Sequence, residues 1–159
     1  MLTPGKALPK PLLQIALPDQ SGETIRLADT AGQWRVVYFY PKDSTPGCTT
    51  EGLDFNALLP EFTKANATVI GVSRDSVKSH ANFCQKQGFA FKLLSDTEGR
   101  LCEAFGVWRM KKNYGREYEG IVRSTFLIDP TGKLVHVWDP VKVKGHAQEV
   151  LDTLKQFSN

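Results

Sequence analysis

The chain has 159 residues, of which 41% are hydrophobic and 23% charged, and this composition predicts one globular domain over residues 1–159. The formal net charge of +3 is small and scattered, so we expect neither nucleic acid nor a membrane surface as a partner. The sequence has no apolar run long enough for a membrane span, and its proline-rich start lacks the apolar core of a signal peptide. We therefore expect a cytoplasmic protein.

The predicted strands are separated by turn signals and by segments with helical spacing. Two short strands flank the turn-rich PDQSGE segment and suggest a hairpin after an extended, proline-containing lead-in. Two runs of β-branched and aromatic residues, WRVVYFY and ATVIGV, are typical of buried central strands. In chain order the predicted strands are 12–16, 24–27, 34–40, 67–72, 91–94, 124–129 and 133–138, the last two forming a second hairpin around PTG.

Helices are predicted between these strands. Apolar residues recur at helical spacing over 55–65, where Pro60 should kink the helix because it removes one backbone donor. Ser76 is a good N-cap for a helix over 77–87 that ends at Gly88. Shorter helices are expected over 98–105 and 146–157. This order predicts an α/β sandwich close to a thioredoxin fold with an extra N-terminal hairpin.

The segment Thr-Pro-Gly-Cys, residues 45–48, has the signature of a helix start. Thr45 is a favoured N-cap and Pro46 a favoured first helical residue, which places Cys48 at the third helical position. Free backbone N–H groups and the positive end of the helix dipole there stabilise a thiolate relative to a thiol. Gly47 leaves space beside the sulfur for a substrate. Cys48 also follows a predicted central strand, and ligands in open α/β sheets bind beyond such strand ends.

The cysteine content excludes some classes of protein. Three cysteines are an odd number and do not fit a secreted disulfide framework, so a disulfide here would be transient and catalytic. Neither the cysteines nor the three histidines show the spacing of a metal site, and we expect no metal and no cofactor.

The residues around Cys48 form a specific motif. Pro41, Thr45 and Cys48 spell Pro-x-x-x-Thr-x-x-Cys, which resembles the active-site motif of the peroxiredoxins. The Thr-Thr-Glu that follows is similar to the bacterioferritin comigratory protein, or PrxQ, branch. The opening Gly-x-x-x-Pro, the VIGVSRD stretch and the RSTFLID stretch are similar as well, so the resemblance extends from about Leu8 to the last helix.

This resemblance implies a thiol-dependent peroxidase that reduces hydrogen peroxide and organic hydroperoxides. It makes Cys48 the peroxidatic cysteine, which peroxide oxidises to sulfenic acid. It also implies that Thr45 hydrogen-bonds the thiolate and the peroxide, and that Pro41 shields the site from water. Arg123, which opens RSTFLID, matches the active-site arginine of the family. Glu51 lies three residues after Cys48 on the same helical face, and the resemblance suggests an active-site role for it too.

The resolving cysteine is the point at which this sequence departs from the commonest PrxQ pattern. Many PrxQ-like proteins place it five residues after the peroxidatic cysteine, where this chain has Leu53. A further set places it on the helix that carries Cys84, and Cys84 is therefore the predicted resolving residue. We expect an intramolecular disulfide with Cys48 that requires local helix unwinding. Cys102 is predicted to be structural, and a one-cysteine cycle with an external thiol remains the alternative.

The predicted partners are a peroxide and thioredoxin or a similar thiol reductant, and the resemblance suggests a monomer. Phe39, Tyr40 and Trp108 are predicted to line the peroxide pocket, where they would favour alkyl groups.

Rival functions share the reactive cysteine. A thioredoxin-like dithiol carrier needs Cys-x-x-Cys, whereas Thr-Thr-Glu follows Cys48. A cysteine–histidine hydrolase is disfavoured because His80, His136 and His146 are predicted to be surface or strand residues. A redox sensor that signals by a change of shape stays open, and catalytic turnover of peroxide would separate it from a peroxidase.

Overall fold

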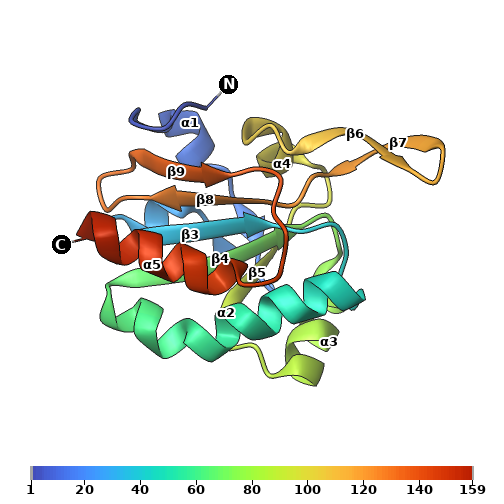
Figure 1. Ribbon diagram of the computed structural model, residues 1–159, viewed down its shortest axis with the longest axis horizontal. Helices are drawn as coiled ribbons and strands as arrows, with labels where there is room; N and C mark the ends of the chain where they lie inside the picture. The colour runs from blue at the N-terminus through green and yellow to red at the C-terminus, as the bar shows by residue number, and fades with distance from the viewer. Residues whose placement is uncertain (1, 159) are drawn as a thin grey trace.

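The computed structural model describes residues 2–158, and a five-stranded sheet forms its centre (Figure 1). The sheet has the strand order β5-β4-β3-β8-β9. Strand β3 pairs in parallel with β4 and antiparallel with β8, so it is central and buried on both faces. The strands are β3 (Trp34–Phe39), β4 (Ala67–Ser73), β5 (Lys92–Ser95), β8 (Ser124–Ile128) and β9 (Leu134–Trp138).

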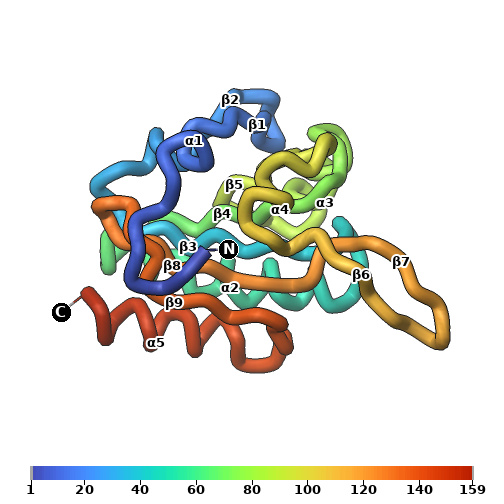
Figure 2. The backbone as a smooth tube through the Cα atoms, turned by 90° about the horizontal axis from the view of Figure 1, so that it is seen from above, coloured from blue at the N-terminus to red at the C-terminus, as the bar shows by residue number. Residues whose placement is uncertain are grey.

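Helices cover both faces of this sheet (Figures 1 and 2). Residues of three helices, α2 (Pro46–Lys64), α3 (Val77–Gln87) and α5 (His146–Ser158), form one core layer with the sheet. The other layer holds α1 (Lys10–Leu13), α4 (Arg100–Ala104), the 3₁₀ turn η1 (Leu27–Thr30) and the hairpin of β1 (Leu17–Pro18) and β2 (Thr24–Ile25). The α/β sandwich of thioredoxin type is therefore confirmed.

Side chains of β3 alternate between the two layers, as the pleat of a strand requires. Tyr38 and Tyr40 lie in the layer that holds Cys48 and Cys84. Phe39 points to the opposite layer, where it packs against the ring of Phe105. The prediction that Phe39 shares a pocket with its neighbour Tyr40 is therefore wrong, because adjacent strand residues face opposite sides of the sheet.

The N-terminal hairpin is confirmed, but its first strand was predicted too early. Residues Lys10–Leu13 form helix α1, and β1 begins only at Leu17. Pro9 is the N-cap of α1 and a second proline lies in its first turn, where proline costs no hydrogen bond. The prolines of the lead-in thus begin a short helix instead of keeping the chain extended.

The boundaries of α3 agree with the sequence. The Ser76 hydroxyl accepts a hydrogen bond from the Ser79 backbone N–H, and Gly88 ends the helix with a left-handed φ of 74°. Helix α2 continues through Pro60 to Lys64 without ending there, and the kink at Pro60 stays a prediction.

Strands β6 (Trp108–Asn113) and β7 (Arg116–Ile121) form a hairpin that the sequence did not predict. The hairpin projects from the body of the molecule (Figure 2). Its strands are mostly exposed and polar, so they lack the alternation of apolar residues that marks a buried strand. Tyr114 and Gly115 both have positive φ, as a two-residue hairpin turn requires, and the glycine was the available signal. Within residues 2–158, no helix has the length and apolar character needed to cross a membrane.

Gly52 of α2 lies against the ring of Phe89, which a side chain at this position would overlap. A Cβ at Gly52 would lie 2.9 Å from Phe89 Cε2 and closer still to Cζ. We predict that Gly52→Ala lowers the free energy of unfolding by about 1–3 kcal/mol, the usual cost of overpacking. Helix propensity alone would predict a gain of about 1 kcal/mol, so the sign of the change is diagnostic.

Urea denaturation of the reduced protein would measure this change. Leu53→Ala, at the exposed neighbouring position, is the control and should change stability little. A stabilised Gly52→Ala variant would show that α2 and Phe89 are not in close contact.

Candidate active site

Cys48 lies at the first turn of α2, directly beyond the carboxyl end of β3. Thr45 is the N-cap, with extended backbone angles (φ −86°, ψ 155°), and Pro46 is the first helical residue, so Cys48 occupies the third helical position as predicted. The thiol is buried, with 2% of the residue exposed. The Thr45 hydroxyl does not cap the helix but donates to the Lys42 carbonyl at 2.8 Å. The backbone N–H groups of the first turn are thus left for an anion.

Arg123 joins Cys48 to Glu51. Its Nη2 donates to the Cys48 sulfur at 3.4 Å, and its Nη1 donates to Glu51 Oε1 at 2.6 Å. The register of the sheet explains the meeting, because Ser124 of β8 pairs with Phe39, the last residue of β3. Arg123 therefore stands beside the loop that leads into α2. The structure brings together three of the predicted site residues that lie up to 75 positions apart in sequence.

Gly47 makes room for this guanidinium rather than for the substrate alone. A Cβ at Gly47 would lie 3.2 Å from Arg123 Nη2, closer than most Cβ contacts. A larger residue would push the guanidinium away from the sulfur.

Glu51 is 1% exposed, and only one of its two carboxyl oxygens has a hydrogen-bond partner. Its Oε1 accepts from Arg123, whereas Oε2 is buried without a hydrogen-bond partner. Burial raises the pKa of Glu51 from 4.5 to about 7, although the charge and the hydrogen bond of Arg123 act in the opposite direction. A carboxyl group that holds its proton near neutral pH therefore stands next to the arginine that contacts the sulfur.

Pro41 and Cys84 are the other two predicted site residues. Pro41 lies exposed in the loop before α2. Cys84 lies in α3, is 8% exposed, and belongs to the same core layer as Cys48. All three thiols are free. Burial, followed by the charges of Asp43 and Asp19, raises the pKa of Cys84 from 9.0 to about 12.

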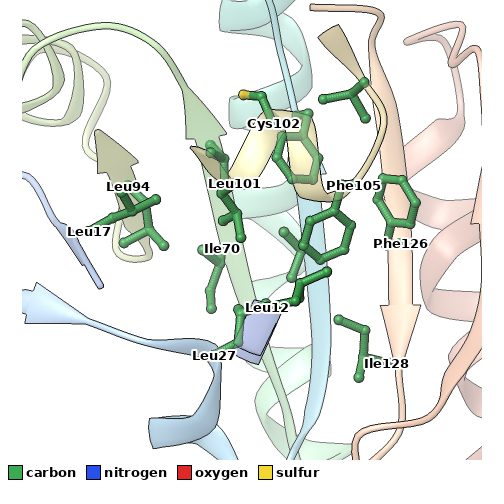
Figure 3. Packing of buried hydrophobic residues seen from close by; sticks show 14 of the residues in the cluster. Leu12, Leu17, Leu27, Ile70, Leu94, Leu101, Cys102, Phe105, Phe126 and Ile128 are labelled. Carbon is green, nitrogen blue, oxygen red and sulfur yellow. The ribbon is translucent and has the colours of Figure 1, made fainter. Parts of the chain in front are cut away.

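Cys102 lies on the other side of the sheet. It is fully buried in α4 among Leu101, Phe105 and Phe126 (Figure 3). Burial, with the charge of Asp96 as the next cause, raises the pKa of the Cys102 thiol far above its ordinary value. The structure thus places Cys84, and not Cys102, in the layer of Cys48.

Two histidines are buried, contrary to the prediction. His80 is 0% exposed in α3, and His146 is buried at the start of α5, whereas His136 is half-buried in β9. Sequence spacing missed His80 because its side chain replaces an apolar residue on the inner face of α3, next to Phe83 and Cys84. Its ring nitrogens contact Asp43 and the Leu94 carbonyl, so both are occupied. Neither nitrogen of His80 is therefore free to act as a base on Cys48.

Asp43 is a further buried residue near Cys48 in sequence that the pattern did not predict. It lies within the predicted motif, at an x position of Pro-x-x-x-Thr, and is 5% exposed. Its carboxylate binds Tyr40, Ser79 and His80, and these hydrogen bonds lower its pKa although burial opposes them. A carboxylate in a loop is usually solvated, and nothing in the local pattern distinguishes this one.

Comparisons with known proteins identify the family of this chain. A model of the AhpC/TSA family matches residues 5–137. The chain belongs to this family. Peroxiredoxin Bcp of Xanthomonas campestris is 60% identical over 148 residues, which cover 93% of this chain and 92% of the relative. Peroxiredoxin Bcp of Bacillus subtilis is 51% identical over 144 residues, covering 91% and 92%. The chain is therefore a peroxiredoxin of the bacterioferritin comigratory protein, or PrxQ, branch, as the motif predicted.

Solved peroxiredoxin structures support the same assignment. A cysteine-to-serine mutant of Xylella fastidiosa PrxQ matches with a TM-score of 0.96 and 52% identity, covering 100% of this chain and 99% of the other. The bacterioferritin comigratory protein of Xanthomonas campestris, solved with trapped intermediate and ligand complexes, matches with a TM-score of 0.93 and 55% identity, covering 99% and 100%. The thioredoxin-like fold of this peroxiredoxin is therefore shown over nearly its whole length.

The raised pKa of Glu51 has a consequence for stability. Between pH 4.5 and 7 the unfolded chain loses the Glu51 proton while the folded protein keeps it, so folding becomes less favourable as pH rises through this window. A shift of this size corresponds to about 3 kcal/mol at pH 8. We predict that Glu51→Gln gains this much stability relative to wild type between pH 4.5 and pH 8.

Urea denaturation of both reduced proteins at several pH values gives the difference, in which the other titrating groups largely cancel. Glu98→Gln, at an exposed position, should show no such trend. A difference that stays constant with pH, or that grows toward acid, would contradict the raised pKa.

Proposed function

We propose that this peroxiredoxin reduces hydrogen peroxide and organic hydroperoxides, with Cys48 as the peroxidatic residue. The observation that carries the proposal is the Arg123 guanidinium 3.4 Å from the Cys48 sulfur at a helix N-terminus. A cation and free N–H groups at one sulfur favour a thiolate and also bind oxygen atoms that gain charge. The Xanthomonas campestris relative is described for its alkyl peroxide reduction activity, which is the same class of chemistry.

The chemical step is a displacement on oxygen. The Cys48 thiolate attacks the terminal oxygen of the hydroperoxide, the O–O bond breaks, and an S–O bond forms. Sulfur is oxidised to sulfenic acid, and the departing alkoxide or hydroxide takes a proton and leaves as alcohol or water. The helix N–H groups and Arg123 face the place where the departing oxygen gains negative charge.

Ionisation of the thiol accounts for little of the rate. An unperturbed thiol with a pKa of ~8.5 is about 3% thiolate at pH 7, so full ionisation gains only about thirtyfold, or roughly 2 kcal/mol. Enzymes commonly lower their barriers by ~8 kcal/mol or more. Most of the acceleration must therefore come from aligning the peroxide and from stabilising the charge on the departing oxygen.

Arg123 is the residue best placed to supply this stabilisation. It is anchored by its position next to β8 and by its carbonyl, which accepts from the Val141 backbone N–H at 2.9 Å. Glu51 fixes the other side of the guanidinium at 2.6 Å, so we assign it the role of orienting Arg123. In the same proposal the Thr45 hydroxyl, held by the Lys42 carbonyl, binds the peroxide, and Pro41 covers the site.

Cys84 is proposed as the resolving cysteine. Its thiol attacks the sulfenic sulfur of Cys48, an S–S bond forms, and the hydroxyl group leaves as water. The buried Cys84, with a pKa of about 12 in place of 9.0, has about a thousandfold less thiolate at neutral pH than an ordinary thiol. Opening of α3 would therefore do two things, because it lets the sulfurs meet and it also restores the reactivity of Cys84.

The rest of the cycle belongs to the same proposal. Thioredoxin or a similar dithiol reduces the Cys48–Cys84 disulfide, and the chain acts as a single-domain monomer over residues 1–159. The odd number of cysteines supports a cytoplasmic location, where thiols stay reduced between cycles.

Removal of the Arg123 or Thr45 side chain should lower the rate of peroxide reduction by more than a change in thiol ionisation can explain. We predict that Arg123→Ala and Thr45→Val each lower the second-order rate constant for peroxide by about a hundredfold or more, the usual loss for a group that stabilises developing charge. Stopped-flow measurement at neutral pH and at a pH where Cys48 is fully ionised would test this. Arg116→Ala, an exposed arginine of β7, is the control. A loss that disappears at high pH would mean that Arg123 acts only on the thiol pKa.

The assignment of Cys84 can be tested by the products. After one equivalent of peroxide, wild type should contain a Cys48–Cys84 disulfide, and Cys84→Ser should retain Cys48 as sulfenic acid. Intact-mass analysis and peptide mapping distinguish the two, and Cys102→Ser should behave as wild type. A stable sulfenic acid in wild type, or a bridge to Cys102, would overturn the assignment of Cys84 and leave Cys48 as the peroxidatic residue.

A further inference from the structure

A buried carboxylate joins the loop before Cys48 to the helix that carries Cys84. Asp43, three residues after the end of the central-strand run at Tyr40, accepts from the Tyr40 hydroxyl at 2.6 Å. Its second oxygen accepts from the Ser79 hydroxyl at 2.7 Å and lies 2.7 Å from His80 Nδ1. Both Ser79 and His80 belong to the first turns of α3. None of these contacts takes part in the peroxide chemistry described above.

Both ring nitrogens of His80 face acceptor atoms. Its Nδ1 faces the Asp43 carboxylate, and its Nε2 lies 3.0 Å from the Leu94 carbonyl, which can only accept. Asp43 already receives two hydroxyl donors and has a lowered pKa, so it is a carboxylate. Both acceptors are satisfied when each ring nitrogen carries an N–H group, and in this form the ring pairs with the Asp43 carboxylate. The pair is almost fully buried, with exposed side-chain fractions of 0% and 2%.

A second contact holds the loop that contains Asp43. The Asp43 backbone N–H donates to Asp75 Oδ2 at 2.9 Å, and Asp75 also accepts from the Ser73 hydroxyl at the end of β4. Asp43, Asp75 and His80 offer atoms within 4.8 Å of one another, a spacing that also suits metal ligands. However, His80 and Asp43 are at hydrogen-bond distance, which leaves no space for a cation between them.

The position of the pair relates it to the two cysteines. Asp43 lies two residues before Thr45, the cap of the Cys48 helix, and His80 lies one helical turn before Cys84 on the same buried face. In Figure 1 the start of α2 and helix α3 lie at the same end of the molecule. The Asp43–His80 pair thus connects the two elements that must separate and rearrange before the sulfurs can join.

We propose that the Asp43–His80 ion pair is a latch that holds α3 closed and sets the rate at which Cys84 becomes available to Cys48. This inference rests on the proposed function for the role of Cys84, but the latch itself concerns the opening of α3. Asp43 and His80 are positioning residues, because neither touches the sulfur in the closed structure. If one partner is removed, the other is left as a buried and unpaired charge, and the docked state of α3 is destabilised.

The first test measures the opening of α3 without any peroxide. His80→Asn and its parent are prepared in the Cys48→Ser background and labelled with N-ethylmaleimide, and peptide mass analysis follows Cys84 and Cys102 separately. Cys84 reports the opening of α3, and the fully buried Cys102 in α4 reports opening on the other side of the sheet. His136→Asn, a half-buried histidine of β9, is the matched control.

A latch predicts a local effect. His80→Asn should raise the labelling rate of Cys84 about tenfold or more, as expected when a buried charge pair loses one member, and should leave that of Cys102 within about twofold. An equal rise at both cysteines would mean that His80 merely stabilises the whole fold, and no rise at Cys84 would mean that the pair does not hold α3. Either result overturns the proposal.

The second test connects the latch to catalysis. With Cys48 present, rapid quench after peroxide gives the rate constant for sulfenic acid formation and that for disulfide formation. His80→Asn should accelerate disulfide formation about tenfold, in parallel with the labelling of Cys84, and change sulfenic acid formation by less than about threefold. Excess peroxide should then convert less of the protein to sulfinic acid, because the disulfide forms first. Unchanged disulfide formation in a variant that does open α3 would refute the control of resolution by the latch.

The two tests separate the two proposals. A rise in Cys84 labelling without any Cys48–Cys84 disulfide in wild type would leave the latch intact and refute Cys84 as the resolving residue. A normal Cys48–Cys84 disulfide in wild type, together with unchanged Cys84 labelling in His80→Asn, would support Cys84 as the resolving residue and refute the latch.

Ser79→Ala is the second variant, for use if His80→Asn does not fold. It removes one hydrogen bond from a neutral donor to the same carboxylate and should raise Cys84 labelling by about two- to tenfold, the usual effect of a single hydrogen bond. A Ser79→Ala variant that labels like its parent would then refute the latch.

Discussion

The pairing of β3 with β8 is the constraint on which the active site depends. Because Phe39 is opposite Ser124, the chain leaves β3 toward Cys48 at the edge of the sheet where Arg123 enters β8. A shift of this register by one residue would turn every β8 side chain to the other face of the sheet and separate the guanidinium from the sulfur. Cys48 is thus positioned by the backbone hydrogen bonds of a central, buried strand, before any side chain contributes.

Two buried carboxylates near Cys48 show how the environment assigns different tasks to one chemical group. Asp43 has hydrogen-bond donors at both oxygens, a cationic partner and a lowered pKa, so it remains charged and joins structural elements. Glu51 has one oxygen on Arg123 and one oxygen without a partner, and its pKa is raised to about 7. The number of satisfied lone pairs, more than the depth of burial, separates the two. The first carboxylate joins two elements of the fold, and the second holds the arginine that contacts the Cys48 sulfur.

Local signals made much of this site predictable. The Thr-Pro-Gly-Cys start of α2 and the Ser76 and Gly88 ends of α3 follow from capping chemistry, which acts within a few residues. The approach of Arg123 does not, because it depends on strand register 75 residues away, and only family resemblance suggested it. The burial of His80 and Asp43 was missed for a related reason. Each looks like an ordinary polar residue in its own segment, and each has a buried partner from a segment distant in sequence.

The segregation of the cysteines has a consequence for the fidelity of oxidation. Cys48 and Cys84 share one core layer, and Cys102 lies in the other, behind the five-stranded sheet and with a thiol that resists ionisation. In the proposed cycle, opening of α3 would expose the Cys84 thiol, which lies in the layer opposite to that of Cys102. In that cycle the five-stranded sheet would separate the two cysteines that form the disulfide from the unpaired Cys102, and this separation would limit incorrect disulfide pairing during turnover.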